Sequence, residues 1–243
     1  EERFSLIFPY ISSTPFYHRK IENEGININS IRSLADLSRI PFTYKYELRN
    51  SSPFERTPLK KEEIYAIYSS GGTSGNATLY VWSEEDVAVQ KDVAQRLFCN
   101  LGVNSADIAL IIAPLSLPVM GHCMIRQYEA AGAAFIPLGP ADPDAVALFI
   151  QQLPITLVAT LPVIASRLYE YIHYSKNSEL SEKTQIRQFH VAGDYLSNAR
   201  RTRIQNYWNA SCYDCYGISE IFGPVAGECI FQNGLHFADE YVY

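Results

Sequence analysis

Continuous apolar runs alternate with amphipathic segments over most of this chain. Runs of strand length occur at 108–113, 133–138, 155–160 and 189–192, and segments with helical periodicity follow them at 121–131, 143–153, 163–174 and 197–208. Strands that are apolar throughout and alternate with helices are typical of right-handed βαβ units on a mostly parallel sheet. The pattern therefore predicts an α/β fold whose sheet is flanked by helices.

The N-terminal part of the chain is more polar and is predicted to be helical. Thr14 is a suitable N-cap with Pro15 in the first turn, and Gly25 is a C-terminal stop. Short helices are expected at 33–39 and after Thr43, which offers another cap, and a long helix is expected from Ser83 to about residue 101. We therefore divide the chain into a helical lead-in, 1–63, and an α/β domain, 64–243.

A loop rich in glycine and hydroxyl groups lies between two further predicted strands, 64–68 and 78–82. It consists of Ser69, Ser70, Gly71, Gly72, Thr73, Ser74 and Gly75. Glycine adopts positive φ at little cost, and hydroxyl and backbone N–H groups can converge on an anion. The loop is not a Walker P-loop, because Asn76 and Ala77 stand where that motif has lysine followed by serine or threonine. These residues alone leave a phosphate-binding loop and a flexible hairpin turn as equal alternatives.

Two other predicted strands end in polar or glycine-containing motifs. One motif is Ala192, Gly193 and Asp194; the other, after a strand expected at 212–215, is Tyr216, Gly217, Ile218, Ser219 and Glu220. In open α/β sheets, ligands bind beyond the carboxyl ends of the strands. We therefore expect the glycine loop and these two motifs to share one rim of the sheet.

The composition narrows the class of protein. With 243 residues and 47% hydrophobic residues the chain can bury one large core or two small ones, and its net charge of −6 argues against a nucleic-acid partner. We interpret its one tight basic cluster, 200–203, as the solvated face of a helix. No apolar run has the ~20 residues of a membrane span, and no signal peptide is evident, so we expect a soluble cytoplasmic protein.

The cysteines do not form a secreted disulfide pattern. There are five of them, an odd number, and reduced thiols are the default expectation. Cys212 and Cys215 have C-x-x-C spacing, but on a strand they point to opposite faces, which predicts buried thiols.

Taken together, the motifs resemble those of adenylate-forming (AMP-binding) enzymes, in particular the branch of phenylacetate–coenzyme A ligases. Residues 69–77 resemble the S-S-G-T-T-G-K-P loop of that family, Gly193-Asp194 resembles its G-E pair, and 216–220 match its Y-G-x-S-E motif. Residues 222–229 and 234–236 resemble the G-P-x-x-x-E-C and G-L-H segments of the branch. The resemblance implies the large N-terminal domain of such an enzyme, without its C-terminal lid domain.

The resemblance also implies an activity and roles for individual residues. The family activates a carboxylic acid with ATP to an acyl-adenylate and then transfers the acyl group to CoA or another thiol. By resemblance, residues 69–75 would hold the phosphates, 192–194 would lie against adenine together with the motif at 216–219, and Glu220 would bind Mg²⁺. Thr73, His122 and Glu220 are the catalytic candidates, and the cofactors are ATP/AMP, Mg²⁺ and CoA.

Two further sites are less defined. The acyl pocket for a small carboxylic acid, aryl or short acyl, is expected from residues 118–128 and the region of Phe189. Within it, His122 and Arg126 are candidates to meet a carboxylate, with a surface or core role as the alternative. By resemblance, Cys229 and His236 would be half of a structural zinc site. Oligomeric state stays open, with a homodimer as one option.

The sequence departs from the family pattern in two places. Without the lysine and proline of the loop, at Asn76 and Ala77, the grip on pyrophosphate should be weaker. Both ends of the sequence suggest truncation, and the ribose-binding acidic residue, the hinge and the mobile lid with its lysine are lacking, so this piece alone should turn over slowly or not at all. A non-catalytic nucleotide-binding or scaffold module, and nucleotidyl transfer without a thiol step, are the alternatives.

Overall fold

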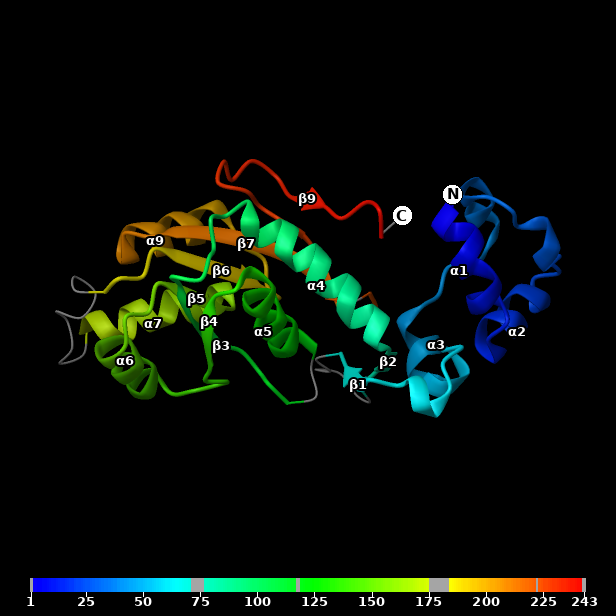
Figure 1. Cartoon of the computed structure of the whole chain (residues 1–243), viewed down its shortest axis with the longest axis horizontal. Helices are drawn as coiled ribbons and strands as arrows, with labels where there is room; N and C mark the ends of the chain where they lie inside the picture. Colours follow the sequence, from blue (N-terminus) through cyan, green and yellow to red (C-terminus); the bar gives the residue numbers. More distant parts are fainter. Residues whose placement is uncertain (1, 71–76, 117–118, 175–183, 222, 242–243) are drawn as a thin grey trace. The chain divides into compact units, whose positions relative to one another are not determined.

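The structure, a computed structural model, describes residues 2–70, 77–116, 119–174, 184–221 and 223–241. The chain divides into two compact units, Glu1–Glu85 and Asp86–Tyr243. Helix α4 (Glu84–Cys99) crosses the boundary between the two units, and the other labelled helices and strands each belong to one unit (Figure 1).

The first unit consists of short helices and one hairpin. The α-helices are α1 (Glu2–Ser12), α2 (Pro15–Asn23) and α3 (Lys45–Asn50), and 3₁₀ turns lie at Ile28–Ser30, Leu34–Arg39, Pro53–Glu55 and Lys61–Glu63. Strands β1 (Ala66–Ser69) and β2 (Leu79–Trp82) pair antiparallel. The Arg56 guanidinium donates to the carbonyl of Leu79 at 2.7 Å, which ties the segment before the hairpin to β2.

The predicted helix boundaries in this unit are confirmed at two positions and wrong at one. Thr14 is the N-cap of α2, and Gly25 follows the helix with φ +67°, a conformation that glycine adopts without a Cβ penalty. Thr43 is not a cap: α3 has Tyr44 at that position. The reason is local, since the Glu47 carboxylate accepts the Tyr44 N–H at 2.6 Å and fixes the helix start one residue later.

The second unit contains a seven-stranded sheet in the order β4-β3-β5-β6-β7-β8-β9. The first five strands in this order, β4-β3-β5-β6-β7, are parallel to their neighbours. The pairs β7–β8 and β8–β9 are antiparallel. The strands are β3 (Ile108–Ile112), β4 (Ala134–Pro137), β5 (Leu157–Thr160), β6 (Gln188–Ala192), β7 (Ser211–Ile218), β8 (Gly223–Gly227) and β9 (His236–Phe237). The predicted α/β fold with a mostly parallel sheet is confirmed.

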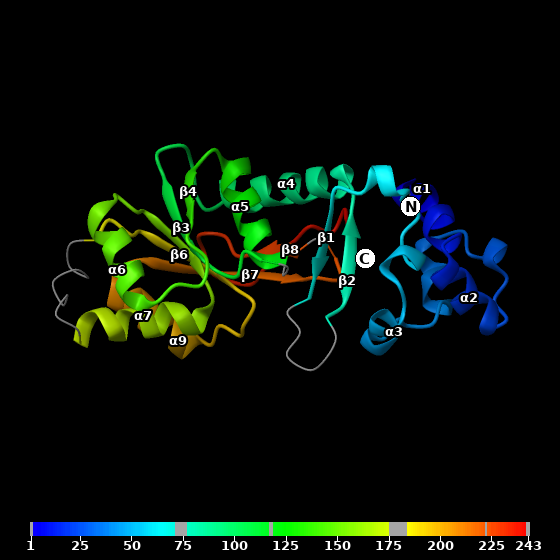
Figure 2. The same ribbon diagram turned by 90° about the horizontal axis from the view of Figure 1, so that it is seen from below.

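Helices cover both faces of this sheet (Figure 2). Helices α4 (Glu84–Cys99) and α5 (Val119–Ala131) lie on one face, and α6 (Pro143–Gln152), α7 (Pro162–Tyr174) and α9 (Asn198–Trp208) lie on the other. Strand residues alternate between the two resulting cores: Leu110 and Ile112 pack with Trp208 on the α9 side, and Ala109 and Ile111 pack with α5. Among the described residues, no helix is long and apolar enough to cross a membrane.

The antiparallel end of the sheet differs most from the sequence prediction. Strand β7 continues to Ile218, beyond the strand expected at 212–215, because its last residues pair with β8. A register shift between Tyr216 and Gly217 interrupts that pairing. The motif expected to follow the strand therefore begins inside it.

Candidate active site

The ends of β6 and β7 bring two of the predicted motifs to one edge of the sheet. These strands are parallel neighbours, and their last paired residues are Ala192 and Cys215. Gly193 follows the end of β6, and Tyr216 is the first residue of β7 beyond its pairing with β6, so both residues lie at the same edge of the parallel part of the sheet. Both strands and both motifs belong to the second unit.

The turn after β6 depends on Gly193. Its φ is +82°, and a Cβ built on it would lie 2.9 Å from the sulfur of Met120 on α5. Asp194 then accepts hydrogen bonds from the Tyr195 N–H at 2.8 Å and from Arg200 at 2.9 Å. The N-cap of α9 is Ser197, and Asp194 holds the loop to this helix through its contact with Arg200.

The motif at the end of β7 combines close backbone packing with exposed side chains. A Cβ on Gly217 would lie 2.2 Å from the carbonyl oxygen of Gly223, so only glycine fits this bulge. The Tyr216 ring is 45% exposed, and its centroid lies 6.1 Å from that of Phe237. Ile218 and Glu220 are also exposed, and Ser219 is half-buried. Tyr216 and Glu220 therefore lie at the surface near the end of β7.

The glycine and hydroxyl loop is described only at its base, in the first unit. Ser69 and Ser70 are buried at the end of β1, and the Ser70 hydroxyl accepts the Thr78 N–H at 3.3 Å. Residues 71–75, with Thr73 among them, and Asn76 lie outside the described residues. Phosphate binding by 69–75 therefore stays a prediction.

Helix α5 carries the residues expected near the acid. The ring nitrogen Nε2 of His122 lies 3.0 Å from the carbonyl oxygen of Ser116, to which its N–H donates, and Arg126 is buried. Pro118 and Phe222 lie outside the described residues. The Phe189 side chain is fully buried and packs against Trp208, with ring centroids 5.3 Å apart, so it belongs to the α9-side core. The roles of His122 and Arg126 stay predictions.

A buried hydrogen-bonded chain that the sequence analysis missed joins α5 to β6. The Tyr128 hydroxyl is 2.8 Å from His190 Nδ1, and His190 Nε2 is 3.0 Å from the side-chain oxygen of Gln188. Burial, followed by the charge of Arg187, lowers the pKa of His190 to about 3, so the ring is neutral. Its Nδ1 then accepts from Tyr128 and its Nε2–H donates to Gln188. Polar residues within apolar runs on β6 and α5 were the available signal.

A second missed feature is the ion pair between Arg201 of α9 and Glu228. Its N···O distances are 2.6 and 2.7 Å, and Glu228 also accepts the Asp214 N–H at 2.8 Å. The interpretation of 200–203 as a solvated helix face is therefore wrong for Arg201, which is largely buried, with its side chain 15% exposed. Burial and the nearby charge of Glu228 raise the pKa of Asp214 to about 6. A glutamate directly after the apolar strand β8 was the signal.

Cys229 and His236, the predicted zinc half-site, have no further ligand set around them in the described part of the chain. Among the residues that the structure describes, no group of three or more His, Cys, Asp or Glu side chains could hold a metal ion. A tetrahedral structural zinc site needs four ligands, so the half-site formed by Cys229 and His236 stays a prediction. Cys212 and Cys215 are buried free thiols, as predicted, and burial raises the pKa of each to about 12.

Comparison with known proteins identifies the class. The family model described as AMP-binding enzyme matches residues 17–239, so the chain belongs to the family of AMP-binding enzymes. A phenylacetate–coenzyme A ligase of Thermus thermophilus is 26% identical over 99% of this chain and 54% of that protein. The corresponding ligase of Escherichia coli K12 is 25% identical over 90% of this chain and 50% of that protein. The chain thus spans about half the length of the curated relatives it matches.

Solved structures agree on the fold. A 2-hydroxyisobutyryl-CoA ligase, crystallised with 2-HIB-AMP and CoA, superposes with a TM-score of 0.87 at 20% identity. The match covers 96% of this chain and 52% of that chain. The chain therefore has the fold found in the N-terminal half of acyl-CoA ligases and resembles the phenylacetate–CoA ligase branch of adenylate-forming enzymes.

Proposed function

We propose that the complete protein uses ATP to convert a carboxylic acid to an acyl-adenylate and then transfers the acyl group to CoA. The observation that carries this proposal is the common edge at which Gly193, directly after β6, and Tyr216, where β7 extends beyond its pairing with β6, lie. Both motifs lie within the part of the chain that matches the family of AMP-binding enzymes. The relatives named as ligases for phenylacetate make aryl acids the first substrates to test.

The chemistry assigns distinct tasks to the residues. A carboxylate oxygen attacks the α-phosphorus of ATP, the bond to the bridging oxygen breaks, and pyrophosphate leaves. The CoA sulfur, after losing its proton, then attacks the acyl carbon and AMP leaves. Negative charge develops on phosphate oxygens in the first step, so donors in the 69–75 loop would bind there, including the catalytic candidate Thr73. The backbone at 192–194 and the exposed Tyr216 ring would hold the adenine.

Magnesium fits this proposal. Glu220 places an exposed carboxylate at the end of β7, and Mg²⁺ is commonly held by one or two carboxylates together with substrate phosphates. When bound, Mg²⁺ would neutralise charge on the phosphates. Cys229 and His236 take no part in the proposal. A cytoplasmic location, the lack of nucleic-acid and membrane partners, and a homodimer stay predictions without bearing on the chemistry.

The proposal is tested by pyrophosphate exchange. The complete protein is supplied with Mg·ATP, labelled pyrophosphate and a panel of aryl and short acyl acids, and acid-dependent label in ATP is the expected result. The absence of exchange with every acid contradicts the proposal. Adding CoA to an accepted acid should give the thioester and AMP; an adenylated product without thioester indicates nucleotidyl transfer instead.

A substitution at Glu220 separates the enzyme from a non-catalytic binding module. Glu220→Gln removes one negative charge at the proposed metal position and should lower exchange by about 10²-fold or more, because electrostatic groups at such sites contribute that much. Glu170→Gln on α7, an exposed glutamate 3.3 Å from Arg203, is the matched control and should keep full exchange. A nucleotide-binding scaffold would bind Mg·ATP equally well in both variants.

A further inference from the structure

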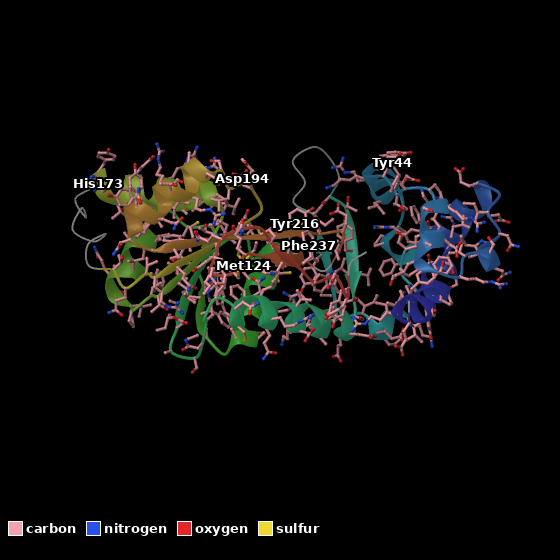
Figure 3. All side chains as sticks on the ribbon, turned by 90° about the horizontal axis from the view of Figure 1, so that it is seen from above. Tyr44, Met124, His173, Asp194, Tyr216 and Phe237 are labelled. Carbon is pink, nitrogen blue, oxygen red and sulfur yellow. The ribbon has the colours of Figure 1, made fainter. Side chains whose placement is uncertain are left out.

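We propose that Phe237 is a positioning residue that holds the Tyr216 ring in the orientation needed to receive adenine. The inference rests on the proposed function and adds a residue to its nucleotide site. At the antiparallel end of the second unit, three strands place Tyr216, Ala226 and Phe237 in one row. Tyr216 and Phe237 are labelled in Figure 3.

The strand register puts these three side chains on one face of the sheet. Tyr216 of β7 is paired with Ala226 of β8, and Ala226 is paired with Phe237 of β9. Residues directly opposite each other on neighbouring strands project to the same face. The adjacent residues project to the other face, where Ala238 packs with Val93 and Leu97 of α4.

The two rings lean toward each other across the middle strand. Strands two positions apart in a sheet are separated by roughly 9.6 Å. The ring centroids of Tyr216 and Phe237 are only 6.1 Å apart, with an interplanar angle of 51°. Both side chains therefore incline over Ala226, whose methyl group is small enough to be covered and is fully buried. A larger residue at 226 would push the rings apart.

Both rings also keep a surface open to a ligand. Tyr216 is 45% exposed and Phe237 is 55% exposed. Contact with Phe237 restricts the rotamers of Tyr216 before any nucleotide arrives. A side chain that is already ordered loses less conformational entropy on binding, so the affinity for the ligand is higher.

The segment that carries Phe237 is fixed independently of Tyr216. Strand β9 has two residues, but the chain beyond it is tied to α4. Arg96 forms an ion pair with Glu240 at 2.5 Å and lies over the Tyr241 ring, 5.7 Å from its centroid. The Tyr241 hydroxyl donates to Asp92 at 3.1 Å. Helix α4 therefore sets the position of Phe237, and Phe237 in turn sets that of Tyr216.

The test measures the KM for ATP in pyrophosphate exchange by the complete protein. Phe237→Ala should raise the KM for ATP by roughly two- to tenfold, the range expected for one aromatic pair. The KM for the acid and kcat should change little, because no contact with the acid is removed. Phe237→Tyr keeps a ring and should restore the parent value. Phe231→Ala, a change at an aromatic side chain that is 80% exposed in the β8–β9 connection, is the matched control and should match the parent.

A double-mutant cycle shows whether Phe237 acts through Tyr216. In a Tyr216→Ala background, Phe237→Ala should cause no further increase in the KM for ATP. Equal effects of Phe237→Ala in both backgrounds, or none in the parent, overturn the inference while exchange by the parent sustains the proposed function. If the parent shows no exchange and no binding of Mg·ATP, the proposed function itself fails and the inference with it. Should Phe237→Ala be unstable, Phe237→Leu gives the same comparison.

Discussion

At the scale of single residues, His190 is a buried histidine whose role is structural. Its ring is fully shielded between Tyr128, Phe98 and Tyr213, and both ring nitrogens have hydrogen-bond partners. Desolvation disfavours the imidazolium, and the two partners are satisfied by the neutral form. This histidine therefore serves to join α5 and β6, not to exchange protons with a substrate.

This burial predicts a defined pH dependence of stability. The pKa of His190 is about 3 in the folded protein and about 6.5 in an unfolded chain, so below pH 6.5 the unfolded state binds the extra proton. The contribution of His190 to the free energy of unfolding is fully present above pH 6.5 and is lost as the pH falls toward 3. The free energy of unfolding should decline by up to about 1.4 kcal/mol per pH unit from this group.

Urea unfolding at pH 7 and pH 5 checks this expectation. In His190→Gln the difference between the two pH values should be smaller than in the parent by about 2 kcal/mol. Tyr128→Phe is the matched variant, since it removes one hydrogen bond but keeps the buried ring. It should cost about 1–2 kcal/mol at pH 7 and retain the pH dependence. An unchanged pH dependence in His190→Gln would contradict the assignment of a neutral buried ring.

At the scale of elements, the antiparallel end of the sheet is joined to its helices by charged contacts. Arg201 connects α9 to Glu228 after β8, and also donates to the carbonyl of Cys212 on β7 at 2.7 Å. Glu228 is almost fully buried, with 5% of its side chain exposed. The pair therefore fixes the position of β8, against which the Tyr216 motif is paired.

Breaking this pair should destabilise the second unit strongly. Glu228→Gln leaves the Arg201 charge largely buried without its carboxylate, a situation that typically costs about 3–5 kcal/mol. Glu170→Gln on α7 breaks an exposed ion pair with Arg203, which lies on α9 as Arg201 does. This change should lower the free energy of unfolding by less than about 1 kcal/mol. The measurement is the urea midpoint of each variant. Similar small shifts for both would show that the buried pair contributes no more than a surface pair.

At the scale of the whole molecule, the two units should respond separately to such a change. The chain has two tryptophans, Trp82 in the first unit and Trp208 in the second, and both are buried. Their fluorescence can be read one at a time in Trp82→Phe and Trp208→Phe backgrounds. Each background therefore reports the unfolding of one unit.

Glu228→Gln should lower the urea midpoint reported by Trp208. The midpoint reported by Trp82 should stay unchanged within experimental error. The physical reason is that the lost contacts all lie in the second unit, between α9, β7 and the residue after β8. Each single-tryptophan protein without the Glu228 change is the control. Equal shifts of both midpoints would show that the two units unfold as one cooperative body.

Most of the elements were predictable because their signals are local. The apolar runs gave β3 to β6, and the start of α2 was predicted from Thr14 and the proline that follows it. The start of α3 was misplaced because the carboxylate of Glu47 decides between two adjacent cap positions. The antiparallel strands β8 and β9 were missed because Gly, Pro and Ala dominate β8, and only pairing with β7 makes the segment extended.

For the candidate site, the sequence by itself determined which motifs exist and in what order, because glycine, hydroxyl and acidic residues at strand ends have chemical uses that depend on few neighbours. Tertiary structure decided which of these residues meet. Gly193 and Tyr216 share an edge because β6 and β7 pair in parallel, Arg201 is buried because Glu228 lies opposite it, and Phe237 reaches Tyr216 across Ala226. Each of these contacts joins residues well apart in the sequence through strand register or helix packing, which no local pattern specifies.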